Sequence, residues 1–219
     1  MILKYSYFEK STLITEKKVF LFYGPNFGKI ESCVQILKNK LTSSDNSLKF
    51  LSFFQDDFLN HSFTEIVHQN TQEDIFGNKA SLIFSLNDLK ISSEIIKVIS
   101  SQNLNIQNII LKTGPIQKGL KIRHFFEDSP DCIIVPCYED SVLEKKDLVM
   151  KFFYNENIEI KPEETEILSS LLSNERCSLN NELNKLILYL KTTKRNVIDA
   201  LSILTDNSTQ DLNNFIYLL

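Results

Sequence analysis

Short apolar runs alternate with helical patterns along the first two thirds of the chain. Each run is apolar on both faces, as is typical of strands in a parallel sheet that helices cover on both sides. The predicted strands are Val19–Tyr23, Leu48–Phe53, Ala80–Phe84, Ile106–Leu111 and Cys132–Val135. The helices predicted between them are Glu31–Leu41, Ser62–Gln69, Ser92–Ser101 and Gln117–Glu127. This alternation predicts an α/β domain over residues 1–140, built on an open parallel sheet.

Only helical patterns follow residue 140. A helix is predicted over Ser141–Tyr154, and Pro162 stands at the first position of the next helix. Apolar residues at helical spacing over Leu179–Leu190 predict a third helix, and a fourth is expected from Lys194 to Leu204. The pattern predicts a small helical domain over residues 141–205.

The turn after the first predicted strand has the setting of a phosphate-binding loop but not its spacing. A working loop has four residues between its glycines and a Ser or Thr after its lysine, so that backbone N–H groups surround the phosphates and the hydroxyl binds Mg²⁺. Here only Pro25-Asn26-Phe27 separates Gly24 from Gly28, and Ile30 follows Lys29. We therefore predict a degenerate loop that does not bind nucleotide. An ordinary strand-to-helix turn is the alternative for this segment.

The sequence also lacks the acidic pair of an ATP-hydrolysing domain. Such domains carry adjacent carboxylates at the end of an apolar strand, where they hold Mg²⁺ and orient water. The stretch Leu82–Asp88 has no such pair at the strand end. Asp56 and Asp57 are adjacent, but a pair in that position more often caps a helix or lies in a solvated turn. No catalytic residue and no cofactor is predicted.

The cysteines and histidines do not form a recognisable metal site. Cys33, Cys132, Cys137 and Cys177 lack the spacing of zinc ligands, and the three histidines are scattered. We expect buried free thiols and no bound metal.

Composition narrows the class of protein further. The chain has 219 residues and a formal net charge of −4, which argues against general nucleic-acid binding by the whole chain. No apolar run is long enough to span a bilayer and the N-terminus lacks a signal-peptide layout, so a cytoplasmic protein without a membrane partner is expected. A local basic stretch, made of Lys112, Lys118, Lys121, Arg123 and His124, remains a candidate nucleic-acid contact or a solvated helix face.

Four segments together resemble one family. They are Phe20–Asn26 (FLFYGPN), Asp74–Lys79 (DIFGNK), Ile134–Asp140 (IVPCYED) and Asn181–Tyr189 (NELNKLILY). Their order and separations are similar to those of the delta subunit of the bacterial DNA polymerase III clamp loader, and the likeness runs from near the N-terminus to about residue 205. The resemblance implies an AAA+-like (P-loop NTPase-type) sheet domain followed by a small helical lid domain.

The resemblance also implies a function in DNA replication. In that family the first domain opens the β sliding clamp with an exposed apolar pair, and Ile75 and Phe76 occupy the matching positions. It implies a subunit without catalysis of its own inside a DNA-directed DNA polymerase (nucleotidyltransferase) holoenzyme. Its partners would be the clamp, the other loader subunits and, through the complex, primed DNA, with Lys118, Lys121 and Arg123 as candidate DNA-proximal residues. From the residues alone, Ile75 and Phe76 could instead pack inward.

The likeness covers less than the whole family pattern. Family members continue into a helical collar domain that assembles the loader, whereas residues 206–219 resemble the start of a linker to a collar that is absent here. Assembly with the other subunits is therefore in doubt. At the domain junction, Tyr138 is expected to pack its ring between the two domains.

Two other classes stay open at this point. One is a phosphoryl-transfer enzyme, in which the loop from Gly24 to Lys29 would have to hold a triphosphate. The other is a nucleic-acid-binding module that uses the basic stretch. ATP binding would distinguish the first from a clamp-binding subunit, and a steep loss of DNA affinity with salt would support the second.

Overall fold

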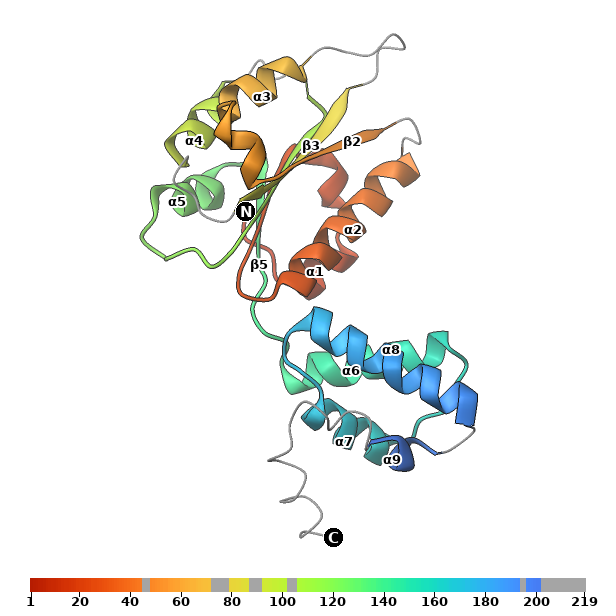
Figure 1. Ribbon diagram of the computed structural model, residues 1–219. Coiled ribbons are helices and arrows are strands. Elements are labelled where there is room, and N and C mark those ends of the chain that lie inside the picture. Colours follow the sequence, from red (N-terminus) through yellow and green to blue (C-terminus); the bar gives the residue numbers. More distant parts are fainter. Residues whose placement is uncertain (45–47, 72–78, 87–91, 102–105, 194–195, 202–219) are drawn as a thin grey trace. The chain divides into compact units, whose positions relative to one another are not determined.

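The computed structural model describes residues 1–44, 48–71, 79–86, 92–101, 106–193 and 196–201. The chain divides into two compact units, Met1–Tyr138 and Glu139–Leu219. The first unit is built on a sheet and the second is helical where the structure describes it (Figure 1).

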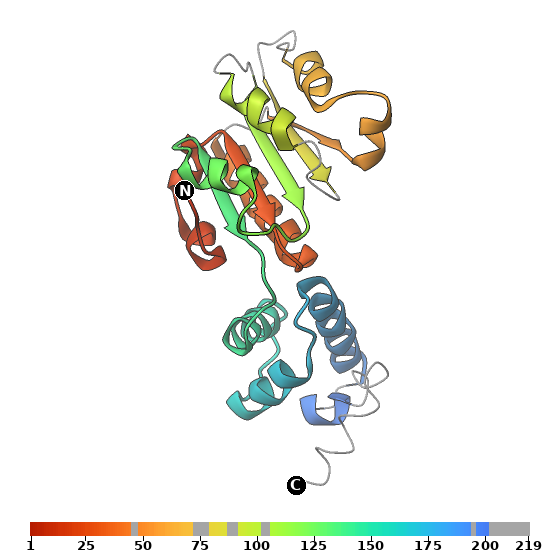
Figure 2. The same cartoon turned by 90° about the vertical axis from the view of Figure 1, so that its left-hand side faces the viewer.

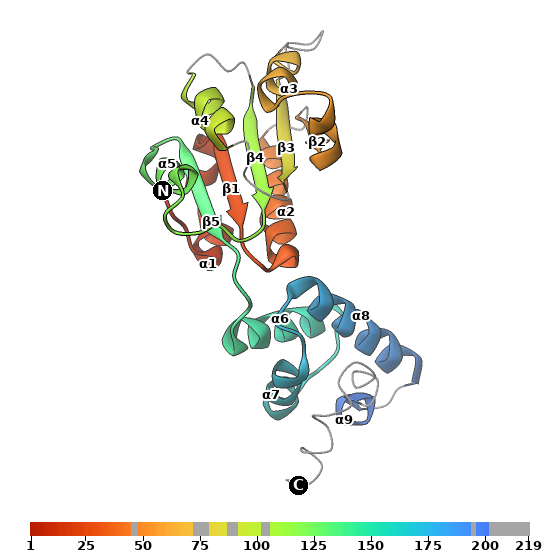
Figure 3. The ribbon, with the colours of Figure 1, turned by 60° about the vertical axis from the view of Figure 1, so that its left-hand side comes forward.

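The first unit contains a five-stranded parallel sheet with the order β2-β3-β4-β1-β5. The strands are β1 (Val19–Tyr23), β2 (Lys49–Phe53), β3 (Ala80–Leu86), β4 (Asn108–Thr113) and β5 (Cys132–Pro136). Strand β1 lies between β4 and β5, and all five of its residues are buried (Figure 3). The five predicted strands are therefore confirmed, with small differences at their ends.

Helices cover both faces of this sheet (Figure 2). Alternate β1 residues point to opposite faces, because side chains alternate along a strand. Phe20 and Phe22 belong to the core shared with α1 (Tyr5–Lys10) and α2 (Phe27–Ser44). The other face packs against the remaining helices, α3 (Phe63–Gln69), α4 (Ser92–Ser100) and α5 (Lys121–Asp128). Two short 3₁₀ helices, Leu13–Glu16 and Gln55–Leu59, complete the described elements of the unit.

The second unit contains the helices α6 (Val142–Asn155), α7 (Pro162–Leu171), α8 (Arg176–Thr193) and α9 (Val197–Ala200). Ser141 caps α6: its hydroxyl accepts a hydrogen bond from the Glu144 amide, and the Glu144 carboxylate accepts one from the Ser141 amide. Pro162 opens α7, as predicted. A separate apolar core holds these helices together, with fully buried residues that include Val149, Phe153, Leu168, Leu179, Leu183 and Leu186.

Among the helices that the structure describes, none is long and apolar enough to cross a bilayer. The described residues also contain no group of three or more His, Cys, Asp or Glu side chains that could hold a metal ion.

Candidate functional site

The turn from β1 into α2 is the segment with the degenerate loop pattern, and it begins with a glycine that the packing requires. Gly24 has a φ of +146°, a backbone conformation that other residues rarely adopt. A Cβ atom at this position would lie 2.2 Å from the carbonyl oxygen of Cys137, which follows β5. Gly24 therefore permits the loop to lie directly against the end of the neighbouring strand.

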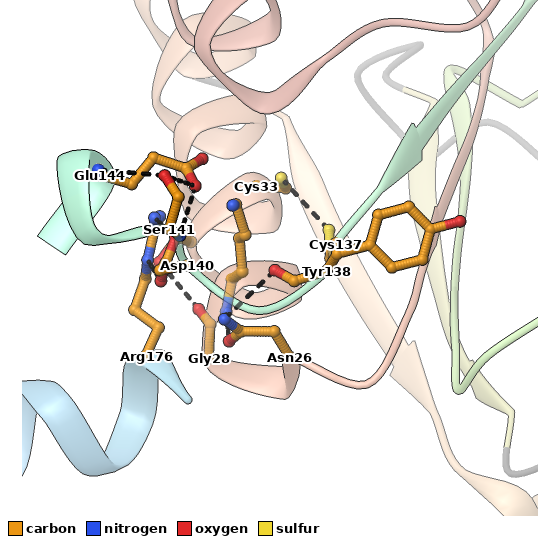
Figure 4. Close-up of polar contacts among 11 residues, drawn as sticks. Asn26, Gly28, Cys33, Cys137, Tyr138, Asp140, Ser141, Glu144 and Arg176 are labelled. Carbon is orange, nitrogen blue, oxygen red and sulfur yellow. Dashed lines mark hydrogen bonds and ion pairs between the residues drawn. The ribbon is translucent and has the colours of Figure 1, made fainter. Parts of the chain in front are cut away.

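Asn26 holds this loop closed. Its backbone N–H donates to the Cys137 carbonyl at 3.1 Å, and its side-chain amide approaches the Tyr138 carbonyl at 3.5 Å (Figure 4). Its side-chain oxygen accepts a hydrogen bond from the backbone N–H of Lys29 at 3.0 Å. Asn26 is fully buried and acts as the N-cap of α2.

This arrangement engages several of the backbone N–H groups that a phosphate would need. A helix N-terminus binds phosphate when its backbone N–H groups point at the ligand. Here the Lys29 N–H bonds to both the side-chain and the backbone oxygen of Asn26, and the Ile30 N–H donates to the Asn26 carbonyl at 3.1 Å. The Gly24 N–H donates to the Thr113 carbonyl at 3.3 Å. Protein atoms thus satisfy donors that would otherwise cradle a phosphate.

The side chains of Lys29 and Ile30 also lie away from solvent. Lys29 is only 4% exposed, so its side chain lies in the interior of the unit. Its Nζ lies 5.3 Å from the centre of the Tyr5 ring, a cation–π contact with α1. Ile30 is buried in the core between the sheet, α1 and α2. Neither side chain is placed to serve a nucleotide.

The acidic residues near the sheet have structural roles where the structure describes them. The Asp57 carboxylate accepts a hydrogen bond from the Phe54 amide at 2.6 Å at the start of a 3₁₀ helix, which confirms the capping interpretation. Glu31 forms an ion pair with Lys112 at 2.6 Å. Asn87 and Asp88, which follow β3, lie outside the described residues.

Three of the four cysteines are buried free thiols, as predicted, but Cys177 is exposed. The Sγ atoms of Cys33 and Cys137 lie 3.9 Å apart beside the closed loop (Figure 4). Burial raises the pKa of the Cys132 thiol, which favours its protonated form. The buried thiols fill the core as small apolar groups.

The three candidate DNA-proximal residues differ in how far their side chains are exposed to solvent. Arg123 pairs with Glu127 at 2.6 Å and lies over the Tyr23 ring, at 5.6 Å from its centre. This ion pair raises the pKa of the Arg123 guanidinium and leaves the side chain largely covered. Lys118 and Lys121 are exposed, in the turn before α5 and at its first residue. Of the three candidates, Lys118 and Lys121 present their charge to solvent as a nucleic-acid contact would require.

Tyr138 is the last residue of the first unit, and its ring packs edge-on against Tyr23 with the ring centres 6.4 Å apart. Its packing between the two domains remains a prediction. Burial raises the pKa of the Tyr23 hydroxyl, and a hydrogen bond with Tyr138 raises it further. Tyr23 is therefore a neutral hydrogen-bonding group at the carboxyl end of β1.

The two candidate clamp-binding residues are not among the residues that the structure describes. Ile75 and Phe76 lie in the segment 72–78 between α3 and β3, outside the described residues. Their proposed role remains a prediction from the sequence.

Sequence reasoning missed the residue that closes the loop. The spacing between Gly24 and Gly28 indicates a degenerate loop. It does not show that the Asn26 side chain caps α2 by accepting a hydrogen bond from the Lys29 N–H. An Asn directly before a helix is a preferred N-cap residue, so the signal was present. The partner of its backbone, the Cys137 carbonyl, could not be found from the local sequence.

Replacing Asn26 with Ala should lower the free energy of unfolding by about 1–2 kcal/mol, the usual cost of losing an N-cap. Chemical denaturation of the two proteins would measure the difference. Asn26→Ser is the matched control, since its hydroxyl keeps an acceptor for the Lys29 amide without burying a charge, and it should lose less. If Asn26→Ala unfolds at the same denaturant concentration as the unchanged protein, Asn26 does not hold the loop.

Comparisons with known proteins identify the fold. No protein-family model matches the sequence, and no curated protein matches it either. Many solved structures do match. One is domain III of the replication initiation protein DnaA from Thermotoga maritima, with a TM-score of 0.57 and 13% identity over 92% of this chain and 88% of that one.

Two further matches are proteins longer than this chain. The Bacillus subtilis DNA clamp loader delta protein matches with a TM-score of 0.51 and 14% identity, over 81% of this chain and 56% of that one. The RuvB Holliday junction branch migration motor from Thermotoga maritima matches with a TM-score of 0.53 and 16% identity, over 87% of this chain and 61% of that one. At such identities the matches show the fold alone. The chain therefore has an AAA+-type fold, with a five-stranded parallel α/β sheet and a helical unit after it.

Proposed function

We propose that this chain is a non-hydrolysing AAA+-type subunit that binds and opens the β sliding clamp during DNA replication. The observation that carries the proposal is the closed loop between β1 and α2. Asn26 caps the helix where a nucleotide phosphate would bind, and Lys29 is buried against Tyr5. An AAA+-type fold whose phosphate site is filled by its own side chain suits a subunit that contributes binding rather than hydrolysis.

The clamp contact that we propose is the apolar pair Ile75 and Phe76. The pair follows Gln72-Glu73-Asp74 and precedes Gly77-Asn78-Lys79, so two large apolar side chains stand in a polar segment. Large apolar side chains that enter a pocket on a partner commonly supply most of the binding free energy of an interface. The similarity to the delta subunit in sequence order, and the match to a clamp loader delta protein in fold, both support this assignment.

The other partners belong to the same proposal. The chain would act beside the remaining loader subunits, which handle ATP, and would approach primed DNA through that complex. Lys118 and Lys121 are the candidate DNA-proximal residues that the structure leaves exposed. Arg123 is withdrawn from this set because Glu127 and the Tyr23 ring already engage it.

The proposal predicts that the purified chain neither binds nor hydrolyses ATP. Calorimetric titration with ATP and Mg²⁺ should show no saturable heat up to about millimolar nucleotide. The Gly24, Lys29 and Ile30 amides already have protein partners, and Ile30 offers no hydroxyl for the metal. Lys29→Ala is the control for any signal that appears. Saturable binding that disappears in Lys29→Ala would show a working phosphate site and would favour the phosphoryl-transfer alternative.

A further inference from the structure

Two buried thiols lie next to each other beside the closed loop. Cys33 belongs to α2 and Cys137 directly follows β5, and their Sγ atoms are 3.9 Å apart (Figure 4). Both residues are completely buried in the core that the sheet shares with α1 and α2. They are 104 positions apart in the sequence, so the fold alone brings them together. The structure shows this pair in its reduced state.

The pair needs only a small movement to form a disulfide. The two sulfur atoms of a disulfide are about 2.0 Å apart, so each Sγ atom has to move by roughly 1 Å. Rotation about the Cα–Cβ bond moves a cysteine sulfur without moving the backbone. The two side chains are therefore placed for a bond between their sulfur atoms.

The other two cysteines lie elsewhere in the fold. Cys132 is buried in the core on the opposite face of the sheet. Cys177 is exposed on α8, in the second unit. Oxidation of the folded chain is therefore expected to link one specific pair, and Cys132 provides an internal control for a buried thiol.

We propose that Cys33 and Cys137 are a redox-sensitive pair, which hydrogen peroxide oxidises to a disulfide that locks the loop between β1 and α2. One thiol, as its thiolate, attacks an oxygen of the peroxide. The O–O bond breaks, the sulfur becomes a sulfenic acid, and the proton of the thiol leaves with the departing oxygen as water. The second thiol then attacks this sulfur: the S–S bond forms, the S–O bond breaks, and the hydroxyl leaves with the second proton as water.

The reaction is balanced by the peroxide alone. The two thiols together lose two electrons and two protons, and the peroxide is reduced to two molecules of water. Hydrogen peroxide is little larger than water, so a local opening of the fold is enough to admit it to the buried pair. A dithiol reductant returns the pair to its thiols by exchange.

The disulfide acts on the segment that holds the loop closed. The Cys137 carbonyl accepts the Asn26 N–H at 3.1 Å, and the Cys137 N–H donates to the Tyr23 carbonyl at 2.7 Å. A bond from Cys137 to Cys33 joins this support to the helix that Asn26 caps. It also links positions far apart in the chain, which restricts the unfolded state and stabilises the folded one. This inference does not depend on clamp binding or on the proposed function.

Peptide mapping of the peroxide-treated full chain tests the pair. Remaining thiols are blocked with N-ethylmaleimide in denaturant, and the chain is digested without reductant. We expect a linked product that contains Cys33 and Cys137 and that dithiothreitol separates. Cys33→Ala should abolish this product, whereas Cys132→Ala, the matched control, should leave its yield unchanged. Circular dichroism verifies that each variant is folded.

The same oxidation in urea shows whether the fold directs the pairing. Loop closure in an unfolded chain favours cysteines that are close in sequence, such as Cys132 and Cys137. The yield of the Cys33–Cys137 product should therefore be at least about fivefold lower in urea than in the folded chain. Equal yields in the two conditions, or no such product from the folded chain, would overturn the inference.

Thermal denaturation tests the locking of the loop. The oxidised chain should melt about 5 °C or more above the reduced chain, because the disulfide closes a long segment of the sequence. Cys33→Ala should show no such rise after the same peroxide treatment. A Cys33–Cys137 disulfide that leaves the melting temperature unchanged would show that it does not lock the loop.

Discussion

Replacement of both Ile75 and Phe76 with Ala is expected to weaken binding to the β sliding clamp more than a hundredfold. The loss corresponds to at least about 3 kcal/mol, the scale of a central hot spot in an interface. The reason is that both side chains would lose their burial in the clamp rather than in the core of this chain. Surface plasmon resonance with the clamp of the same organism immobilised would measure the change.

The stability of the same variant distinguishes an interface from a core. If the pair is a surface anchor, the free energy of unfolding should change by less than about 1 kcal/mol. Leu188→Ala combined with Ile198→Ala is a matched control, because both residues are exposed apolar side chains on the second unit. Clamp binding retained by a strongly destabilised Ile75/Phe76 variant would show that the pair packs inward.

A second large effect is expected from Asp140→Ala, which should lower the free energy of unfolding of the second unit by about 3–5 kcal/mol. The Asp140 side chain is completely buried and accepts two hydrogen bonds from Arg176, at 2.6 and 3.0 Å (Figure 4). Removing the carboxylate leaves the Arg176 charge buried without its anionic partner. Thermal and chemical denaturation, followed by circular dichroism, would measure the loss.

Two control variants distinguish the loss of stability caused by breaking this ion pair from a general effect of mutation. Asp147→Ala removes an exposed carboxylate from the same unit and should change stability by less than about 0.5 kcal/mol. Asp140→Leu combined with Arg176→Met should be less costly than Asp140→Ala, because it removes the buried guanidinium together with its carboxylate partner. A loss for Asp140→Ala no larger than that of Asp147→Ala would show that the pair does not stabilise the unit.

The strands could be predicted because each carries its own signal. Strand β1 is buried at every position, and its neighbours are nearly so, which gives continuous apolar runs that need no partner to be recognised. Helix α1 was missed for the opposite reason. It spans only Tyr5–Lys10, and Phe8 is its one fully buried residue, so six residues give no periodic pattern.

The candidate site was predicted only in part, because its state depends on contacts between distant segments. The irregular glycine spacing and Ile30 can be seen in the sequence. The closing of the loop by Asn26 depends on the Cys137 carbonyl, and the burial of Lys29 involves Tyr5 on a helix that was not predicted. The exposure of Cys177 and the covering of Arg123 by Glu127 likewise arise from the fold rather than from composition.

The most direct measurement is a calorimetric titration of the purified β sliding clamp with this chain, performed without nucleotide and again with ATP and Mg²⁺. We expect saturable binding with the same dissociation constant in both titrations, because the contact needs no nucleotide and the loop between β1 and α2 is closed by Asn26. No binding, or binding that appears only when ATP is present, would contradict the proposal of a non-hydrolysing clamp-binding subunit.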